Sequence, residues 1–228
     1  MTPPAEDGRR DGGGTREPRA DGPLLAALRA VPLLPVLRSA DPDAALEQIG
    51  VLRAAGLPVI ELTTSIPHWQ AALRATADRW PELLVGVGTV TTPHQADQAV
   101  QSGARFLVSP WPSPDVRPVA AAAGVDFLEG GFTPAEVAAA AGRGIAKLFP
   151  AHVGGPAYLR SLLAVLPGAR IIPTGGIRPA DAADYLRAGA VAVGVGSALA
   201  GEADLPARIA AMRAVAAEVQ RPVDGTAR

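Results

Sequence analysis

One residue type is almost absent from this chain, and its single representative lies where a reactive group could act. Among 21 basic residues the only lysine is Lys147, inside the apolar run 145–150, and all the others are arginines. An amine can lose its proton, attack a carbonyl carbon and form an imine, which a guanidinium cannot do. A general drift from lysine to arginine could also leave one lysine by chance. Because buried lysines are rare without a partner or a chemical role, Lys147 is a candidate nucleophile.

A carboxyl group interrupts a second apolar run. Glu61 lies within residues 59–64, where a buried charge is costly unless it is paired, hydrogen-bonded or neutralised by a proton. Alternate residues of a β-strand share a face, so Val59, Glu61 and Thr63 point to the same side. If Lys147 lies on that side too, the carboxyl group could move protons while the amine becomes a neutral nucleophile. The alternative is a buried ion pair between Glu61 and an arginine of a neighbouring helix.

Two glycine-rich turns indicate an anion site. The segments 172–177 (IPTGGI) and 193–197 (VGVGS) place backbone amides close to predicted helix starts, an arrangement that binds phosphate. The candidate phosphate-binding residues are Thr174, Gly175, Gly176, Gly196 and Ser197. A Gly-Gly pair alone is usually only a turn, so the prediction depends on the two turns together. Neither contains the full dinucleotide fingerprint, and a nicotinamide cofactor is therefore not expected.

Composition limits the class of partner. The 228 residues carry a formal net charge of −1, 48% of them are hydrophobic, and none is cysteine. There is no basic field to attract nucleic acid or an anionic membrane, and no thiolate or disulfide framework. The histidines His68, His94 and His152 lack the local spacing of metal ligands, so no metal is expected. These features favour a cytoplasmic protein that binds a small molecule.

The order of apolar and helical segments predicts an α/β fold. Eight short apolar segments read as strands, at 33–38, 59–64, 83–90, 106–110, 125–130, 145–150, 169–175 and 191–196. Helix starts are expected at Asp41-Pro42, Thr92-Pro93, Ser113-Pro114, Thr133-Pro134 and Arg178-Pro179, and helix ends at Gly56, Gly103, Gly124 and Gly189. Fully apolar strands that alternate with helices indicate a parallel sheet, and eight such units fit a (β/α)8 TIM barrel.

The predicted domain organisation is simple. Residues 1–22 form a disordered N-terminal tail, 23–221 one barrel domain, and 222–228 a C-terminal tail. An extra helix at 23–30 is expected to cover the N-terminal mouth of the barrel, and a helix at 205–220 closes the fold. The arginine pair at 9–10 does not begin an export signal, because Arg29, Pro32 and Pro35 break the apolar stretch that follows.

Functional residues of such barrels lie where strands end. The polar residues at those positions are Arg38, Glu61, Thr63, Thr89, Lys147, Thr174 and Ser197, together with the glycines of the last two turns. With them in place, the chain resembles the class I (Schiff-base) aldolases that cleave 2-keto-3-deoxy-6-phosphogluconate (KDPG), its galactonate epimer or 4-hydroxy-2-oxoglutarate (KHG). The resemblance covers about residues 24 to 200 and rests on VLRSADPDAAL, IELTTSIPHW, LVGVGTV, AKLFPAHVGGPAYL, IIPTGGI and VGVGSAL.

The resemblance implies a role for each residue. Lys147 forms a covalent imine with a 2-oxo acid substrate and no other cofactor is used, Glu61 is the general acid and base, and Thr89 and Arg38 bind the substrate carboxylate. Thr63, Ser65, Phe149 and Pro150 line the pocket, and the two glycine-rich turns hold the phosphate. Cleavage gives pyruvate and glyceraldehyde 3-phosphate, or pyruvate and glyoxylate from KHG. The family also implies a homotrimer.

Four single positions and one short stretch bear on the substrate. Gluconate-type members carry arginine where this chain has Ser65, whereas Arg38 and the stretch 67–69 look like the galactonate type. Glu129 and Trp111 replace a proline and a small or polar residue, and both are expected to reshape the pocket. A phosphosugar isomerase or epimerase on the same barrel, or a non-catalytic phospho-ligand binder, would share the phosphate turns but would not require Lys147 as a nucleophile.

Overall fold

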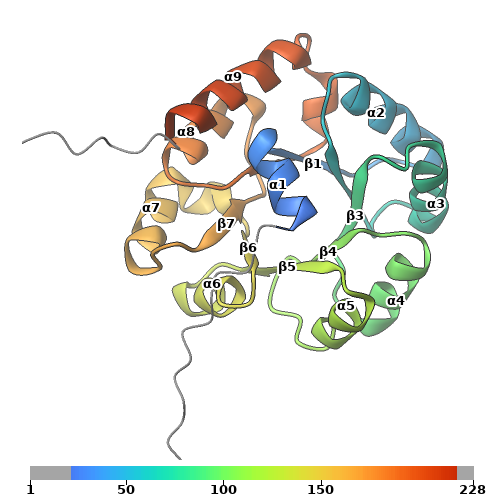
Figure 1. Cartoon of the computed structure of the whole chain (residues 1–228), viewed down its shortest axis with the longest axis horizontal. Coiled ribbons are helices and arrows are strands. Elements are labelled where there is room, and N and C mark those ends of the chain that lie inside the picture. Colours follow the sequence, from blue (N-terminus) through green and yellow to red (C-terminus); the bar gives the residue numbers. More distant parts are fainter. Residues whose placement is uncertain (1–21, 220–228) are drawn as a thin grey trace, which may run out of the picture.

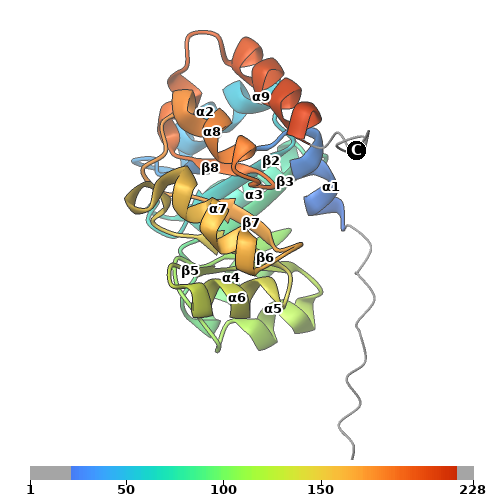
Figure 2. The same cartoon turned by 90° about the vertical axis from the view of Figure 1, so that its left-hand side faces the viewer.

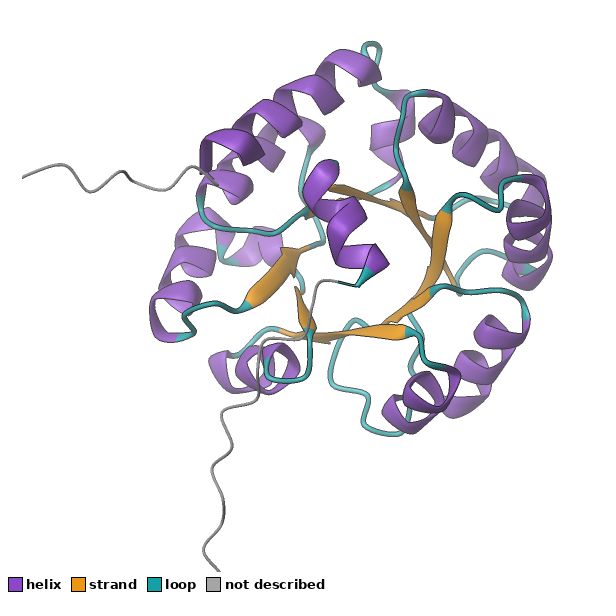
Figure 3. Cartoon of the chain, viewed as in Figure 1, coloured by secondary structure: helices purple, strands orange, loops and turns teal. Residues whose placement is uncertain are grey.

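A computed structural model describes residues 22–219, in which eight parallel strands form a ring surrounded by helices (Figures 1 and 3). The strands are β1 (Leu33–Leu37), β2 (Val59–Thr63), β3 (Leu84–Gly88), β4 (Phe106–Val108), β5 (Asp126–Gly131), β6 (Ile145–Leu148), β7 (Arg170–Pro173) and β8 (Val193–Val195). Their order is β7-β6-β5-β4-β3-β2-β1-β8, and a parallel bridge between Thr174 and Gly194 joins the two ends. The predicted (β/α)8 barrel is confirmed.

The helices follow the strands in alternation. They are α1 (Pro23–Ala30), α2 (Pro42–Ala54), α3 (Trp69–Arg79), α4 (Pro93–Gln101), α5 (Arg117–Ala123), α6 (Pro134–Ala141), α7 (Gly155–Val165), α8 (Ala182–Arg187) and α9 (Leu205–Val219). Short 3-10 helices occupy Ala151–Val153, Pro179–Asp181 and Ser197–Gly201. Within residues 22–219 no helix has the length and apolar character needed to cross a membrane. The predicted tails, apart from Gly22, lie outside the described residues.

Local signals explain most helix ends. The side chains of Asp41, Thr92 and Thr133 accept hydrogen bonds from the backbone at the starts of α2, α4 and α6, and each is followed by proline. Gly56, Gly103, Gly124 and Gly189 adopt positive φ after α2, α4, α5 and α8, as predicted. The predicted start at Ser113-Pro114 is wrong. Ser113 binds the Trp111 carbonyl and Glu129 instead, and α5 begins only at Arg117.

The extra helix covers the N-terminal end of the barrel, as the sequence predicts. Figure 1 shows α1 across the opening of the ring, and Figure 2 shows it at one end of the strands. Its buried residues Leu24, Leu25 and Leu28 belong to one apolar cluster with inward-facing residues of the strands, including Val59, Phe106, Val108, Leu128 and Ile172. This cluster fills the N-terminal half of the barrel interior, so the polar residues at the carboxyl ends of the strands lie above a packed apolar core.

Glu129 faces the helices, and the prediction that it reshapes the pocket is therefore wrong. In the β5–β6 ladder Gly130 pairs with Lys147, whereas Glu129 pairs with Ala146 and points away from the barrel interior. Its side chain is 3% exposed and forms ion pairs with Arg117 and Arg143. The backbone N–H of Ser113 also donates to it at 2.8 Å. The arrangement considered for Glu61, a buried carboxylate paired with an arginine of a neighbouring helix, is thus the one that Glu129 adopts with Arg117 of α5, and Arg143, after α6, adds a second ion pair.

We expect the Glu129 cluster to stabilise the fold in a pH-dependent way. Burial alone raises the pKa of the Glu129 carboxyl, but hydrogen bonds from Arg117, Ser113 and Arg143 outweigh it and hold the pKa below its usual value. Folding is therefore favoured at pH values above the unfolded pKa of glutamate, and this contribution disappears as pH falls through the lower folded pKa. Glu129→Gln should lower the free energy of unfolding by about 1–3 kcal/mol at neutral pH, because it removes the charge that pairs with both arginines. The loss is moderate because the side chains of Arg117 and Arg143 are partly exposed to water.

Denaturant unfolding at neutral and acidic pH measures this effect. The difference between Glu129→Gln and the unmodified protein should shrink on acidification, since the carboxylate is then protonated in both states. Any catalytic activity that depends on Lys147 serves as the control and should stay within about twofold, because Glu129 faces away from Lys147. A stability difference that does not change with pH would contradict this account.

Candidate active site

Strands β2 and β6 bring Glu61 and Lys147 together inside the barrel. The Lys147 Nζ lies 3.6 Å from the Glu61 Oε1, and the two residues are 5% and 0% exposed. This separation permits electrostatic attraction but is longer than a hydrogen bond. Within residues 22–219 neither carboxyl oxygen of Glu61 has a hydrogen-bond partner. A buried carboxyl group with free hydrogen-bonding capacity beside an amine is equipped to exchange protons with a third group placed between them.

Burial governs the protonation of Glu61. Desolvation raises the pKa of the Glu61 carboxyl above its usual value, and the opposing positive charges of Lys147 and Arg38 do not overcome it. The neutral acid therefore persists to higher pH than for a glutamate in water. A carboxyl group with a raised pKa can donate a proton and take it back near neutral pH.

A glycine makes room for the carboxyl group. Gly88 ends β3 beside Glu61, and a methyl group added at its Cα would overlap the Glu61 Oε1. Gly86, which pairs with Glu61 in the β2–β3 ladder, leaves space in the same way for the ring of Phe106. The sequence LVGVG thus supplies small residues where the barrel interior must accept one acid and one aromatic ring.

We expect Gly88→Ala to displace Glu61 and to lower kcat/KM of any reaction that uses Glu61 by about 100-fold or more, because small displacements of a reacting group are costly. Gly50→Ala is a matched control, since a methyl group at Gly50 in α2 lies 3.7 Å from Trp80, an ordinary contact. The control should keep its activity. Steady-state kinetics and thermal unfolding of both variants separate loss of geometry from loss of fold, and full activity of Gly88→Ala would refute the assignment.

Phe149 connects Lys147 to the first glycine-rich turn. The Lys147 Nζ lies 5.5 Å from the centroid of the Phe149 ring. The same ring packs so closely against Gly175 that a methyl group there would lie 2.7 Å from it. Gly175 and Gly176 have φ values of 97° and 70°, which other residues adopt only with strain. The amine and the turn therefore both lie close to one aromatic ring, and Pro150 follows Phe149 in the chain.

The second turn lies beside the first. Thr174 pairs with Gly194 at the junction of β7 and β8, and Gly196 leads into the 3-10 helix that begins at Ser197. The Ser197 hydroxyl accepts a hydrogen bond of 3.0 Å from the backbone N–H of Arg38. The ends of β7, β8 and β1 thus form one continuous rim, and the residues predicted for phosphate lie together on it.

Other predicted residues have distinct surroundings. The Thr63 hydroxyl donates to the Leu37 carbonyl at 2.9 Å, so the Ser65 hydroxyl, 2.7 Å away, is the donor between the two side chains. Thr63 is fully buried and ties β2 to β1. Arg38 is exposed after β1, and its charge reaches Glu61 electrostatically. Thr89 follows β3 in a left-handed conformation with φ 61°.

Sequence reasoning missed two neighbours of the site. The Thr64 hydroxyl donates to the Thr89 carbonyl at 3.0 Å, and the His152 Nδ1 lies 3.2 Å from the Gly175 carbonyl. The position of Thr64 directly after a buried strand is the signal that could have found it. Trp111, expected to reshape the pocket, has 56% of its surface exposed. In the described part of the chain no three His, Cys, Asp or Glu residues group as a metal site would require.

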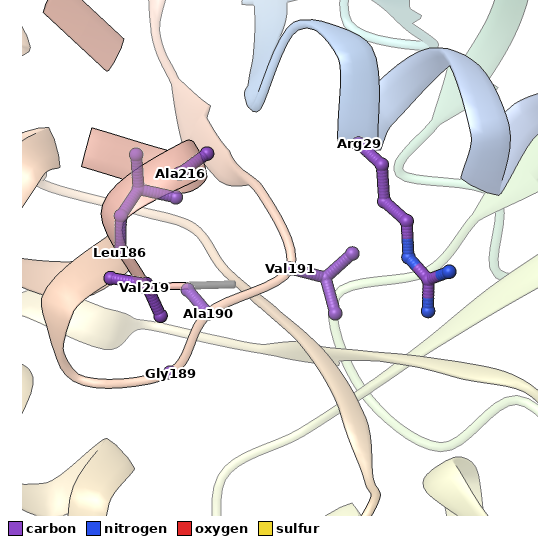
Figure 4. A pocket seen from close by; sticks show the side chains of 7 residues that line it. All are labelled: Arg29, Leu186, Gly189, Ala190, Val191, Ala216 and Val219. Carbon is purple, nitrogen blue, oxygen red and sulfur yellow. The ribbon is translucent and has the colours of Figure 1, made fainter. Parts of the chain in front are cut away.

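A separate cavity of about 420 Å³ lies at the opposite end of the barrel (Figure 4). It is lined by Arg29, Leu186, Gly189, Ala190, Val191, Ala216 and Val219, which belong to α1, α8, α9 and the loop before β8. None of these residues takes part in the cluster around Lys147. This cavity is therefore distinct from the Lys147–Glu61 pair, which lies inside the ring of strands.

A (β/α)8 barrel that holds a buried amine beside a buried carboxyl group with a raised pKa has the architecture of an imine-forming enzyme. The family model described as KDPG and KHG aldolase matches residues 24–210, and the chain belongs to this aldolase family. The fold and family implied by the sequence are confirmed.

Individual proteins similar to this chain are named as aldolases of the same family. The chain is 33% identical over 173 residues to 2-dehydro-3-deoxy-6-phosphogalactonate aldolase of Escherichia coli, covering 74% of this chain and 84% of that one. It is 35% identical over 166 residues to 2-dehydro-3-deoxy-phosphogluconate aldolase of Pseudomonas aeruginosa, covering 72% and 74%. A solved structure of KDPG aldolase from Legionella pneumophila, with pyruvate captured as a covalent carbinolamine, is also similar to this chain. The TM-score is 0.72 and the sequence identity is 29%, and the match covers 86% of this chain and 98% of that one.

Proposed function

We propose that this protein is a class I aldolase that cleaves a 2-keto-3-deoxy-6-phospho sugar acid to pyruvate and glyceraldehyde 3-phosphate. The observation that carries the proposal is the buried pair of Lys147 and Glu61, 3.6 Å apart inside the barrel. Membership of the KDPG and KHG aldolase family supports the same reaction. Cleavage of 4-hydroxy-2-oxoglutarate to pyruvate and glyoxylate follows the same chemistry.

The reaction proceeds through the lysine. Lys147 adds as the free amine to the C2 ketone. Protonated Glu61 then donates its proton to the carbinolamine hydroxyl, which leaves as water and gives a cationic imine and the Glu61 carboxylate. Glu61 removes the proton of the C4 hydroxyl as the C3–C4 bond breaks, and the electron pair of that bond moves into the imine to form an enamine. The aldehyde leaves. Glu61 returns a proton to C3, and water releases pyruvate and the free amine. The imine nitrogen is the electron sink, so the proposed route uses no metal or organic cofactor.

The remaining predicted residues bind the two ends of the substrate. Arg38 and Thr89 hold the carboxylate, and Thr63, Ser65, Phe149 and Pro150 line the pocket between the ends. The phosphate is held by backbone amides and hydroxyls of Thr174, Gly175, Gly176, Gly196 and Ser197. The adjacency of Phe149 to both Lys147 and Gly175 supports this orientation of the substrate.

Reduction with borohydride in the presence of pyruvate tests the proposal. The protein should gain one covalent pyruvate adduct, and peptide mapping should place it on Lys147. A phosphosugar isomerase or epimerase, or a non-catalytic phospho-ligand binder, would gain none at that residue. Comparison of kcat/KM for the gluconate and galactonate epimers and for 4-hydroxy-2-oxoglutarate then identifies the preferred substrate.

We expect Arg38→Ala to weaken substrate binding. Loss of a charge-assisted hydrogen bond to the carboxylate should lower kcat/KM by about 10- to 100-fold, mainly through KM. Arg187→Ala, which removes an exposed arginine paired with Asp184 on α8, is the control and should behave like the unmodified enzyme. Unchanged kcat and KM for Arg38→Ala would remove this role.

We also propose that the enzyme is a cytoplasmic homotrimer whose barrel domain spans residues 23–221. A phosphorylated substrate favours an intracellular location, and the family resemblance favours the trimer. The exposed apolar side chains of Trp111 and Val153, on the loops that follow β4 and β6, are consistent with a subunit contact at this end of the barrel. Light scattering on the purified protein measures the subunit number.

A further inference from the structure

Thr89 has a backbone conformation that its residue type disfavours. Its φ of 61° lies in the left-handed region, where a β-branched side chain is strained. Within residues 22–219 only His68 shares a positive φ among residues other than glycine. Gly88, one residue earlier, faces Glu61, so a continuing strand would aim Thr89 at the helices. The left-handed conformation ends the alternation of side-chain directions along β3. The direction of the Thr89 side chain therefore depends on this conformation.

One residue binds both peptide groups that flank Thr89. The backbone N–H of Thr64 donates to the Gly88 carbonyl at 3.0 Å, and the Thr64 hydroxyl donates to the Thr89 carbonyl at 3.0 Å. The N–H of the second peptide group, that of Val90, donates to the Val108 carbonyl at 3.0 Å. The orientations of these two peptide planes define φ and ψ of Thr89. Thr64 therefore binds the first plane with its backbone, and its side chain shares the second plane with the Val108 carbonyl.

We propose that Thr64 is a positioning residue for the active site, whose hydroxyl holds Thr89 in the left-handed conformation needed to meet the substrate carboxylate. The part that concerns the substrate rests on the proposed function, whereas the conformational part does not. The Thr64 hydroxyl stabilises a strained residue next to the Glu61–Lys147 pair. Without it, Thr89 should relax to an extended conformation, which a threonine prefers.

The test uses variants of the full chain. Thr64→Val keeps the shape of the side chain but removes the hydroxyl, and should lower kcat/KM for cleavage about tenfold, chiefly by raising KM. Thr64→Ser restores the hydroxyl and should return the activity to within about twofold. Thr76→Val is the matched control, since it removes a threonine hydroxyl that donates to the Ala72 carbonyl at 2.7 Å within α3. It should leave both kinetic constants unchanged.

A double-mutant cycle separates positioning from a general loss of stability. Glycine adopts a left-handed conformation without strain, and it leaves no side chain to position. In a Thr89→Gly background Thr64→Val should therefore change kcat/KM by no more than about twofold. If Thr64→Val alone does not fold, Thr89→Gly should restore folding. A double variant that still does not fold, or that keeps the tenfold loss, overturns the proposal.

A crystal structure of Thr64→Val gives a readout that does not depend on activity. We expect Thr89 to leave positive φ, and an unchanged left-handed Thr89 would overturn the proposal whatever the kinetics. Borohydride trapping with pyruvate on the unmodified protein tests the proposed function separately. If no Lys147 adduct forms there, the aldolase assignment fails, while the conformational role of Thr64 is still decided by the φ of Thr89.

Discussion

Replacement of Lys147 by methionine should abolish cleavage. Methionine has a similar length and suits a site that is only 5% exposed, but it cannot form an imine. We expect kcat to fall by at least about 10⁴-fold, since the covalent route is lost and only binding effects remain. Borohydride reduction in the presence of pyruvate should then give no adduct at position 147. Stopped assays with purified variant measure the first effect and intact mass the second.

The single lysine of this chain allows an unusually direct control. Arg105→Lys introduces a second lysine at an exposed position, next to β4 and outside the site. If reactivity belongs to the buried environment rather than to any amine, peptide mapping of Arg105→Lys should find pyruvate on Lys147 and not at position 105. Equal labelling of both positions would remove Lys147 as the nucleophile. Residual turnover of Lys147→Met well above about one part in 10⁴, the background expected without the amine, would do the same.

Glu61→Gln should produce the second largest effect. Glutamine keeps the size of the side chain but cannot accept and return a proton, so kcat should fall by about 10²- to 10⁴-fold. Lys147 remains in place, and its adduct with pyruvate should still form under borohydride, more slowly. Retention of full kcat by Glu61→Gln would assign the proton transfers to another group.

The same variant has an expected effect on stability whose sign can be worked out. Burial raises the pKa of Glu61 in the folded protein, so the folded state binds this proton more tightly than the unfolded chain. The contribution of Glu61 to stability is complete below its unfolded pKa and is lost as pH rises through the raised folded pKa. Glu61→Gln removes that loss. Denaturant unfolding should therefore show that the stability of Glu61→Gln rises relative to that of the unmodified protein as the pH is raised from about 5 to about 8.

The sequence predicts the barrel because the signals that specify it are local. Apolar runs such as 59–64 and 145–150 form buried strands, and proline after Asp41, Thr92 or Thr133 starts helices. The failure at Ser113-Pro114 has a cause that lies elsewhere in the fold. This pair has the composition of a helix start, but the Ser113 hydroxyl donates to the Trp111 carbonyl and its backbone N–H donates to Glu129 of β5. No local pattern reports such a competitor.

The sequence by itself determined the chemistry available: one amine in an apolar strand, one acid in another, and two glycine-rich turns. Only the tertiary structure decided which acid meets the amine. Glu61 and Glu129 both lie in apolar strands, yet strand register points the first toward Lys147 and the second toward Arg117 and Arg143. Side-chain direction alternates along a strand, so a shift of one residue exchanges the two faces, and register is fixed only when the ring of strands closes.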